Sequence, residues 1–137
     1  MPRTALAQFG NLRSARYTAT LVRPADEATV EQHYDFGTGE LARGRTSRPE
    51  AVMWQLHDVG ELAGFARYWR DFQPDQGLVF PFRAADVAAA AHLLAYATPS
   101  PLPERVELAV VDRAVAVALV AAGGVRTETQ LELAGPL

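Results

Sequence analysis

Three residue types are missing from this chain: its 137 residues include no cysteine, no lysine and no isoleucine. The lack of cysteine excludes disulfides, thiolate zinc sites and a cysteine nucleophile. All 13 basic residues are therefore arginine. Because lysine and isoleucine have A/T-rich codons, this bias indicates a bacterial genome rich in G and C rather than a functional need for arginine.

Long hydrophobic runs are also absent. The longest candidate covers residues 84–97, and Asp86 and His92 interrupt it, so it does not have the character of a membrane span. The first three residues are not followed by the apolar core of a signal peptide. Together with the lack of cysteine, these absences predict a cytoplasmic protein that has no membrane partner.

Composition and charge predict one globular domain. Hydrophobic residues make up 49% of the chain and charged residues 21%, which is typical of globular proteins. The length fits a single domain over residues 1–137, in which residues 1–16 form an arm or an extra strand. The net charge of −3 predicts no nucleic-acid partner. The densest basic group (Arg43, Arg45 and Arg48) is interpreted as a solvated loop.

Hydrophobic periodicity and turn residues predict the order of strands and helices. The expected strands cover residues 17–22, 51–57, 62–69, 77–82, 105–111 and 125–133, and the expected helices cover residues 25–34, 40–45, 86–96 and 112–122. Asp86 and Asp112 are expected to cap the last two helices, and Gly123 and Gly124 to end the last one. The strand–helix–strand units require parallel pairing. The predicted fold class is therefore α/β, with a mixed sheet that carries helices on both faces.

Several local sequences resemble those of the GNAT acetyltransferase superfamily. Arg23-Pro24 ends the first strand before an acidic helix, residues 60–65 read Gly-Glu-Leu-Ala-Gly-Phe in the hairpin, and Gly123-Gly124 ends the last helix. Segments 34–41 and 80–86 are similar to a GNAT subtype that forms the second half of tandem proteins. The resemblance spans residues 17–134. It implies the GNAT-like acyl-CoA N-acyltransferase fold and the transfer of an acetyl group from acetyl-CoA to an amine, whose identity the sequence does not specify.

The resemblance also implies where acetyl-CoA binds. The expected site is the fork between strands 77–82 and 105–111, where the backbone from Phe80 to Phe82 contacts the acetyl and pantetheine parts. The family binds the pyrophosphate at a helix start, in the pattern Arg/Gln-x-x-Gly-x-Gly/Ala. Arg83 and Ala88 fit this pattern. The resemblance thus implies Phe80, Phe82, Arg83 and Ala88 as cofactor-binding residues.

Three family positions are altered in this chain. Asp86 stands where the first glycine of the phosphate loop is expected, and as a helix cap it would occupy the donors that a phosphate needs. The asparagine and tyrosine positions of the last helix hold Arg113 and Val120. The alternative is therefore an inactive GNAT-like binding or dimerisation module, in which a homodimer replaces the missing tandem half. A further alternative is an unrelated mixed α/β protein, which would lack two splayed parallel strands at the fork.

The sequence offers weak candidates for a catalytic base. Tyr68 belongs to a strand that borders the substrate cleft in the resembled fold, and His57 lies at the end of the hairpin. His92 stands among alanines and leucines, which is typical of a packed histidine. His33 and Glu61 have the right chemistry but no supporting pattern. No spaced cluster of histidine and carboxylate residues predicts a metal site.

Overall fold

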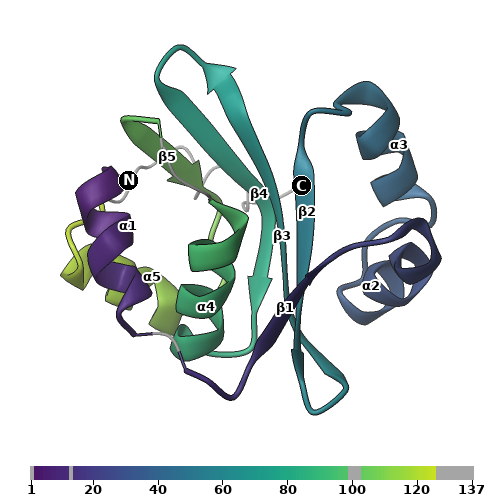
Figure 1. The fold of residues 1–137 in the computed structure, drawn as a ribbon, viewed down its shortest axis with the longest axis horizontal. Helices are drawn as coiled ribbons and strands as arrows, with labels where there is room; N and C mark the ends of the chain where they lie inside the picture. Colours follow the sequence, from purple (N-terminus) through teal and green to yellow (C-terminus); the bar gives the residue numbers. More distant parts are fainter. Residues whose placement is uncertain (1, 13, 99–102, 126–137) are drawn as a thin grey trace.

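The computed structural model describes residues 2–12, 14–98 and 103–125, and these form a mixed sheet with helices on both faces (Figure 1). The strands are β1 (Thr18–Leu21), β2 (Val52–Asp58), β3 (Glu61–Gln73), β4 (Gln76–Ala84) and β5 (Arg105–Leu108). The helices are α1 (Arg3–Gly10), the short 3₁₀ helix η1 (Pro24–Asp26), α2 (Glu27–His33), α3 (Glu40–Ser47), α4 (Val87–Ala97) and α5 (Arg113–Ala121). The predicted mixed sheet with helices on both faces is confirmed; the fold is α+β, which is compatible with the predicted α/β class.

The five strands lie in the sheet in the order in which they occur in the sequence. β1, β2, β3 and β4 pair antiparallel with their neighbours, and β5 pairs parallel with β4. The β2–β3 hairpin turns at Val59 and Gly60, whose φ angles are 49° and 83°. Two positive φ angles in a two-residue turn match the right-handed twist of the flanking strands, which fixes the hairpin predicted from the sequence.

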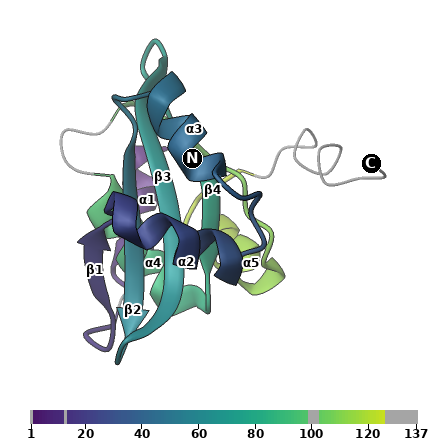
Figure 2. The same ribbon diagram turned by 90° about the vertical axis from the view of Figure 1, so that its right-hand side faces the viewer.

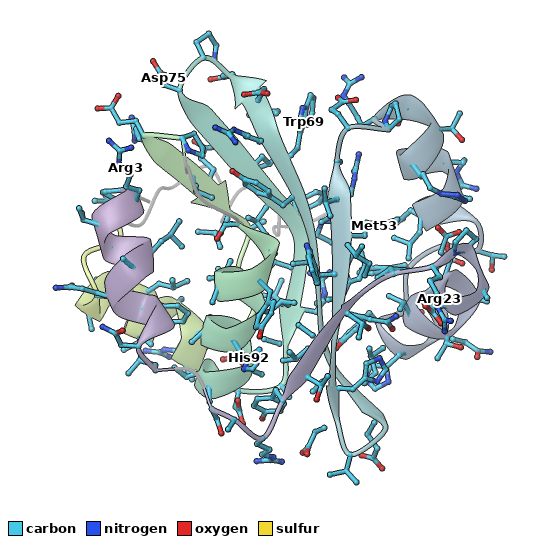
Figure 3. All side chains as sticks on the ribbon, in the orientation of Figure 1. Arg3, Arg23, Met53, Trp69, Asp75 and His92 are labelled. Carbon is cyan, nitrogen blue, oxygen red and sulfur yellow. The ribbon has the colours of Figure 1, made fainter. Side chains whose placement is uncertain are left out.

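Each face of the sheet has its own hydrophobic core. Helices α1, α4 and α5 cover one face, and α2 and α3 cover the other, as Figure 2 shows with α2 and α3 turned toward the viewer. On the α2–α3 side, Met53 and Phe65 pack with Val30 and Leu41, and Met53 points into this layer in Figure 3. On the α4 side the core is larger, because α4 is apolar on almost every face and buries most of its side chains. None of the described helices is both long and apolar enough to cross a membrane.

The predicted caps of α4 and α5 are confirmed. Asp86 accepts a hydrogen bond from the Ala89 amide, and Asp112 accepts one from the Val115 amide. α5 ends at Ala121, and Gly123 follows it with a φ angle of 113°, which favours glycine. The Gly124 amide donates to the Leu119 carbonyl at 2.9 Å, in the pattern of a Schellman motif.

The structure corrects the expectation for the N-terminus. Residues 1–16 were expected to form an arm or an extra strand, but residues 3–10 form helix α1. Ala5, Leu6 and Phe9 are buried there because they share one face of the helix, which packs on α4 and α5.

Several element bounds also differ from the sequence prediction, and β4 in particular continues to Ala84 rather than ending at residue 82. β5 ends at Leu108 rather than at residue 111, α3 continues to Ser47, and β3 runs on to Gln73. The predicted strand 125–133 lies outside the described residues, apart from Val125.

Candidate functional site

A bulge in β4 separates this strand from β5. Phe82 pairs with Ala66 of β3, and Val79 pairs with Tyr68, so two β4 residues lie opposite one residue of β3. As a result, Val79 and Phe82 both enter the α4-side core although two residues separate them. A bulge bends its strand and increases the local twist. Pro81 is tolerated at this point because a bulged residue need not donate to the ladder.

The two parallel strands part just after the bulge begins. Their pairing ends at Val79 and Leu108, whereas β4 continues to Ala84. Beyond this point, among the strands of the described residues, β4 pairs only with β3, and just after its end the Ala85 amide donates to the Ala63 carbonyl at 2.9 Å. Since successive amides of a strand point in opposite directions, the amides of Phe82 and Ala84 face the open side of β4. The carboxyl ends of β4 and β5 thus form a fork with backbone donors on one wall.

A cavity of about 260 Å³ lies at this fork. Its lining comes from the end of β4, from the link between β5 and α5, and from the end of α2. The lining residues are Tyr34, Phe82, Arg83, Ala84, Val110, Val111, Asp112 and Val115. The walls are therefore largely apolar and carry three polar side chains.

The guanidinium of Arg83 is the positive charge of this cavity. Its Nη1 donates to the Phe82 carbonyl at 3.0 Å, and the group lies 5.3 Å from the centre of the Phe36 ring, on the α2–α3 side of the sheet. Tyr34 lies on the same side: burial raises the pKa of its phenol to about 12, and the charge of Arg83 partly opposes this rise. The cation therefore sits among aromatic rings on one wall.

Asp112 supplies the negative charge from the other wall, at the start of α5. Its Oδ1 accepts from the Val115 amide at 3.1 Å. The ion pairs among the described residues join other side chains, so neither Arg83 nor Asp112 takes part in one. The two charges line the same cavity without pairing with each other.

The start of α4, where the family resemblance expects the pyrophosphate, is occupied by Asp86. Its Oδ1 accepts from the Ala89 amide at 2.7 Å, and its Oδ2 accepts from the Tyr17 hydroxyl at 2.8 Å. Burial raises the pKa of Tyr17, and the hydrogen bond to Asp86 raises it further. The amides of Val87 and Ala88 donate no hydrogen bond to a described residue. The helix start thus offers two free donors beside a carboxylate that is already engaged twice.

The structure brings together two of the four residues expected to bind the cofactor. Phe82 and Arg83 line the fork cavity, and Phe82 is only 2% exposed. Phe80 does not line the cavity, and its side chain is 50% exposed. Ala88 packs against the α4-side core instead.

The two candidates for the base lie away from the cavity. Tyr68 is buried in the α4-side core, and its hydroxyl has no hydrogen-bond partner among the described residues. Burial raises its pKa. The Nε2 of His57 lies 3.0 Å from the Gln55 Oε1, at the β1 side of the sheet. Neither residue lines the cavity.

His92 is packed, as the sequence predicts. Its Nδ1 lies 2.9 Å from the Ser14 carbonyl oxygen, and its ring stacks on Tyr96 with 5.1 Å between centres. Figure 3 shows it on α4, beside the chain that leads into β1. Within the described part of the chain, no group of three or more His, Asp and Glu residues could hold a metal ion.

Sequence reasoning missed Tyr34 and Asp112 as cavity residues. Tyr34 was noted only within a matching segment, and Asp112 only as a cap. One signal could have found Asp112: it follows the strand directly, and ligands of parallel sheets bind outside the carboxyl ends of the strands. Tyr34 comes from a helix that is distant in the sequence, and no local pattern marks it.

No protein-family model, curated protein or solved structure matches this chain.

Proposed function

We propose that this chain is a GNAT-like N-acetyltransferase domain that takes acetyl-CoA at the fork between β4 and β5 and transfers the acetyl group to an amine. The observation that supports the proposal is the parting of these parallel strands after Val79 and Leu108. The GNAT resemblance requires such a fork at this place in the chain. An unrelated mixed α/β protein has no reason to have one here.

The residues of the fork fit the acyl end of the ligand. When bound, acetyl-CoA supplies a thioester whose carbonyl carbon an amine can attack. The outward-facing amides of Phe82 and Ala84 are placed to donate to an oxygen in the fork, because β5 no longer covers them. Fixed backbone donors of this kind stabilise negative charge that develops on a carbonyl oxygen. Phe82 and Val115 keep water from the back of the cavity.

The pyrophosphate end fits less well. The free amides of Val87 and Ala88 are the type of donor that binds phosphate at a helix start. However, the Asp86 carboxylate lies at the same helix start and repels an anion. Affinity for the nucleotide half is therefore expected to be weak, and the fork has to supply most of the binding.

Calorimetric titration with acetyl-CoA tests this proposal. Val111 lines the cavity but is 69% exposed, so Val111→Trp fills the cavity entrance at little cost in stability. Val117→Trp is the matched control, because Val117 is 61% exposed and lies outside the cavity lining. We expect saturable binding to the parent chain and to Val117→Trp, and a loss of about tenfold or more for Val111→Trp, since the indole replaces the ligand in the site.

The proposal is refuted if the parent chain gives no heat of binding with millimolar acetyl-CoA. If both tryptophan variants bind acetyl-CoA with equal affinity, the binding site is not the fork. Transfer itself is then measured as thiol release in the presence of a panel of amines.

A non-catalytic GNAT-like module is the second candidate, and Asp86 favours it. Both carboxylate oxygens of Asp86 hold the fold together, so this residue has a complete structural role at the position where an enzyme needs a phosphate site. The outer face of α5 exposes Val117 and Val120, which suits contact with a second copy. A stable dimer in sedimentation, combined with no binding of acetyl-CoA, supports this candidate over the enzyme.

A further inference from the structure

Two opposite charges line the fork cavity, and neither has a charged partner among the residues that the structure describes. Arg83 donates only to the Phe82 carbonyl, which is neutral, and it is half-buried against Phe36. Asp112 uses one oxygen to cap α5, and no described residue donates to its Oδ2. Arg83 is half-buried, and a charge beside apolar walls is costly unless it is paired or hydrogen-bonded, whereas the Asp112 side chain is exposed and its free oxygen is open to a ligand as well as to water. This cavity therefore favours a ligand that brings a complementary charge to each wall.

We infer that the cavity binds a small amine that also carries a carboxylate, an amino acid being the simplest example. Its carboxylate meets Arg83, and its amine meets the free Oδ2 of Asp112. The planar guanidinium suits a carboxylate because it offers paired donors. The valine side chains and Phe82 suit an apolar side chain on the ligand.

The position of the two charges agrees with an acceptor rather than a phosphate. Arg83 lies on the α2–α3 side of the sheet, whereas the start of α4, where the nucleotide is expected, lies on the other side. A phosphate in this cavity would also face the Asp112 carboxylate. Reading the ligand as the acetyl acceptor rests on the proposed function, but the binding of an amino acid does not require acetyl-CoA.

Three related compounds separate the two contacts. L-Leucine carries both charges, 4-methylpentanoate carries only the carboxylate, and isoamylamine carries only the amine. Each is titrated in the absence of acetyl-CoA into the parent chain, Arg83→Met and Asp112→Asn. The asparagine variant keeps an oxygen for the α5 cap. Arg70→Met is the control, because Arg70 is exposed and lies outside the cavity. Glycine is titrated in parallel, to cover the case in which the leucine side chain is too large for the cavity.

The inference predicts that leucine or glycine binds more tightly than the singly charged compounds. Arg83→Met is expected to weaken binding of the amino acid and of 4-methylpentanoate by about tenfold or more, since a charge-assisted hydrogen bond is lost. It should leave isoamylamine unchanged. Asp112→Asn is expected to show the reverse pattern. Arg83→Lys keeps the charge and should recover part of the binding, which guards against misfolding of the methionine variant.

Three results overturn the inference. One is no saturable binding of leucine or glycine at millimolar concentration. Another is that the amino acid binds with equal affinity to Arg83→Met and Arg70→Met when both variants are folded. The third is an Arg83-dependent preference for succinyl-CoA over acetyl-CoA without amino-acid binding, because the carboxylate would then belong to the acyl group. If the chain binds an amino acid but not acetyl-CoA, the proposed function is refuted and this inference is supported.

Discussion

Replacing Asp86 by alanine tests the structural role of this residue. The change removes the acceptor for the Ala89 amide, and loss of a helix cap costs about 1 kcal/mol. It also leaves the Tyr17 hydroxyl, whose side chain is 4% exposed, without its acceptor, which costs about 1 kcal/mol more. The free energy of unfolding should therefore fall by about 2 kcal/mol. For a chain of this length that corresponds to a fall in Tm of about 6–10 °C.

Urea unfolding of four chains measures this effect: the parent, Asp86→Ala, Tyr17→Phe and the double variant. Tyr17→Phe alone should cost about 1 kcal/mol. The double variant should lose about 2 rather than 3 kcal/mol, because the hydrogen bond between the two side chains is counted once. Asp86→Asn should cost about 1 kcal/mol, less than Asp86→Ala, since its amide oxygen still caps the helix but its amide nitrogen cannot accept from the Tyr17 hydroxyl. A loss below about 0.5 kcal/mol for Asp86→Ala, or strict additivity in the double variant, refutes the reasoning.

Three other substitutions test separate parts of the account. Tyr68→Phe removes a buried hydroxyl that has no partner within the described part of the chain, so the free energy of unfolding in urea should stay the same or rise by up to about 1 kcal/mol. Any acetyl transfer should continue at the same rate, whereas a loss of transfer would support Tyr68 as the base. Tyr34→Phe should reduce the fall in the free energy of unfolding as the pH rises above 10. The pKa of Tyr34 is raised from 10.0 to about 12, so its contribution is complete below pH 10 and is lost as pH rises toward 12; an unchanged slope in unfolding between these pH values contradicts this. Phe9→Ala should cost about 3–5 kcal/mol in thermal unfolding, because Phe9 lies on the packed face of α1 and is fully buried. A neutral change would mean that α1 does not pack on the rest of the fold.

Local sequence signals account for most of the fold. Several short patterns each have a single physical interpretation: the Val59-Gly60 turn, the two aspartate caps and Gly123 after the last helix. These signals predicted the hairpin and placed the ends of the last two helices within one residue of the structure. The mixed sheet then follows from the order of the elements, since the strand–helix–strand unit requires parallel pairing of β4 with β5.

Helix α1 escaped prediction because its apolar face is short. Leu6 and Phe9 mark only one stripe over eight residues, and a helix of this length is marginal without the surface on which it packs. That surface comes from α4 and α5, which lie far along the chain.

The candidate site was predicted only in outline. The fork was expected between the correct strands, but its cause, the bulge opposite Arg67, is a tertiary feature of the β3–β4 pairing. The cavity also depends on Tyr34 and Asp112, which come from different elements and meet only in the folded chain. The strand pattern fixes the position of Tyr68 along β3, and only the structure shows that its side chain enters the α4-side core.

The central claim, that acetyl-CoA binds in the fork, is tested most directly by amide NMR of the labelled chain during titration with acetyl-CoA. The account predicts that the largest shifts appear at Phe82 and Ala84, which face the open side of β4, and that residues of the cavity lining such as Val111 follow the same saturation curve. Shifts confined to other surfaces, for example the groove between α1 and α4 lined by Leu6 and Leu94, or no shifts at millimolar ligand, would contradict it.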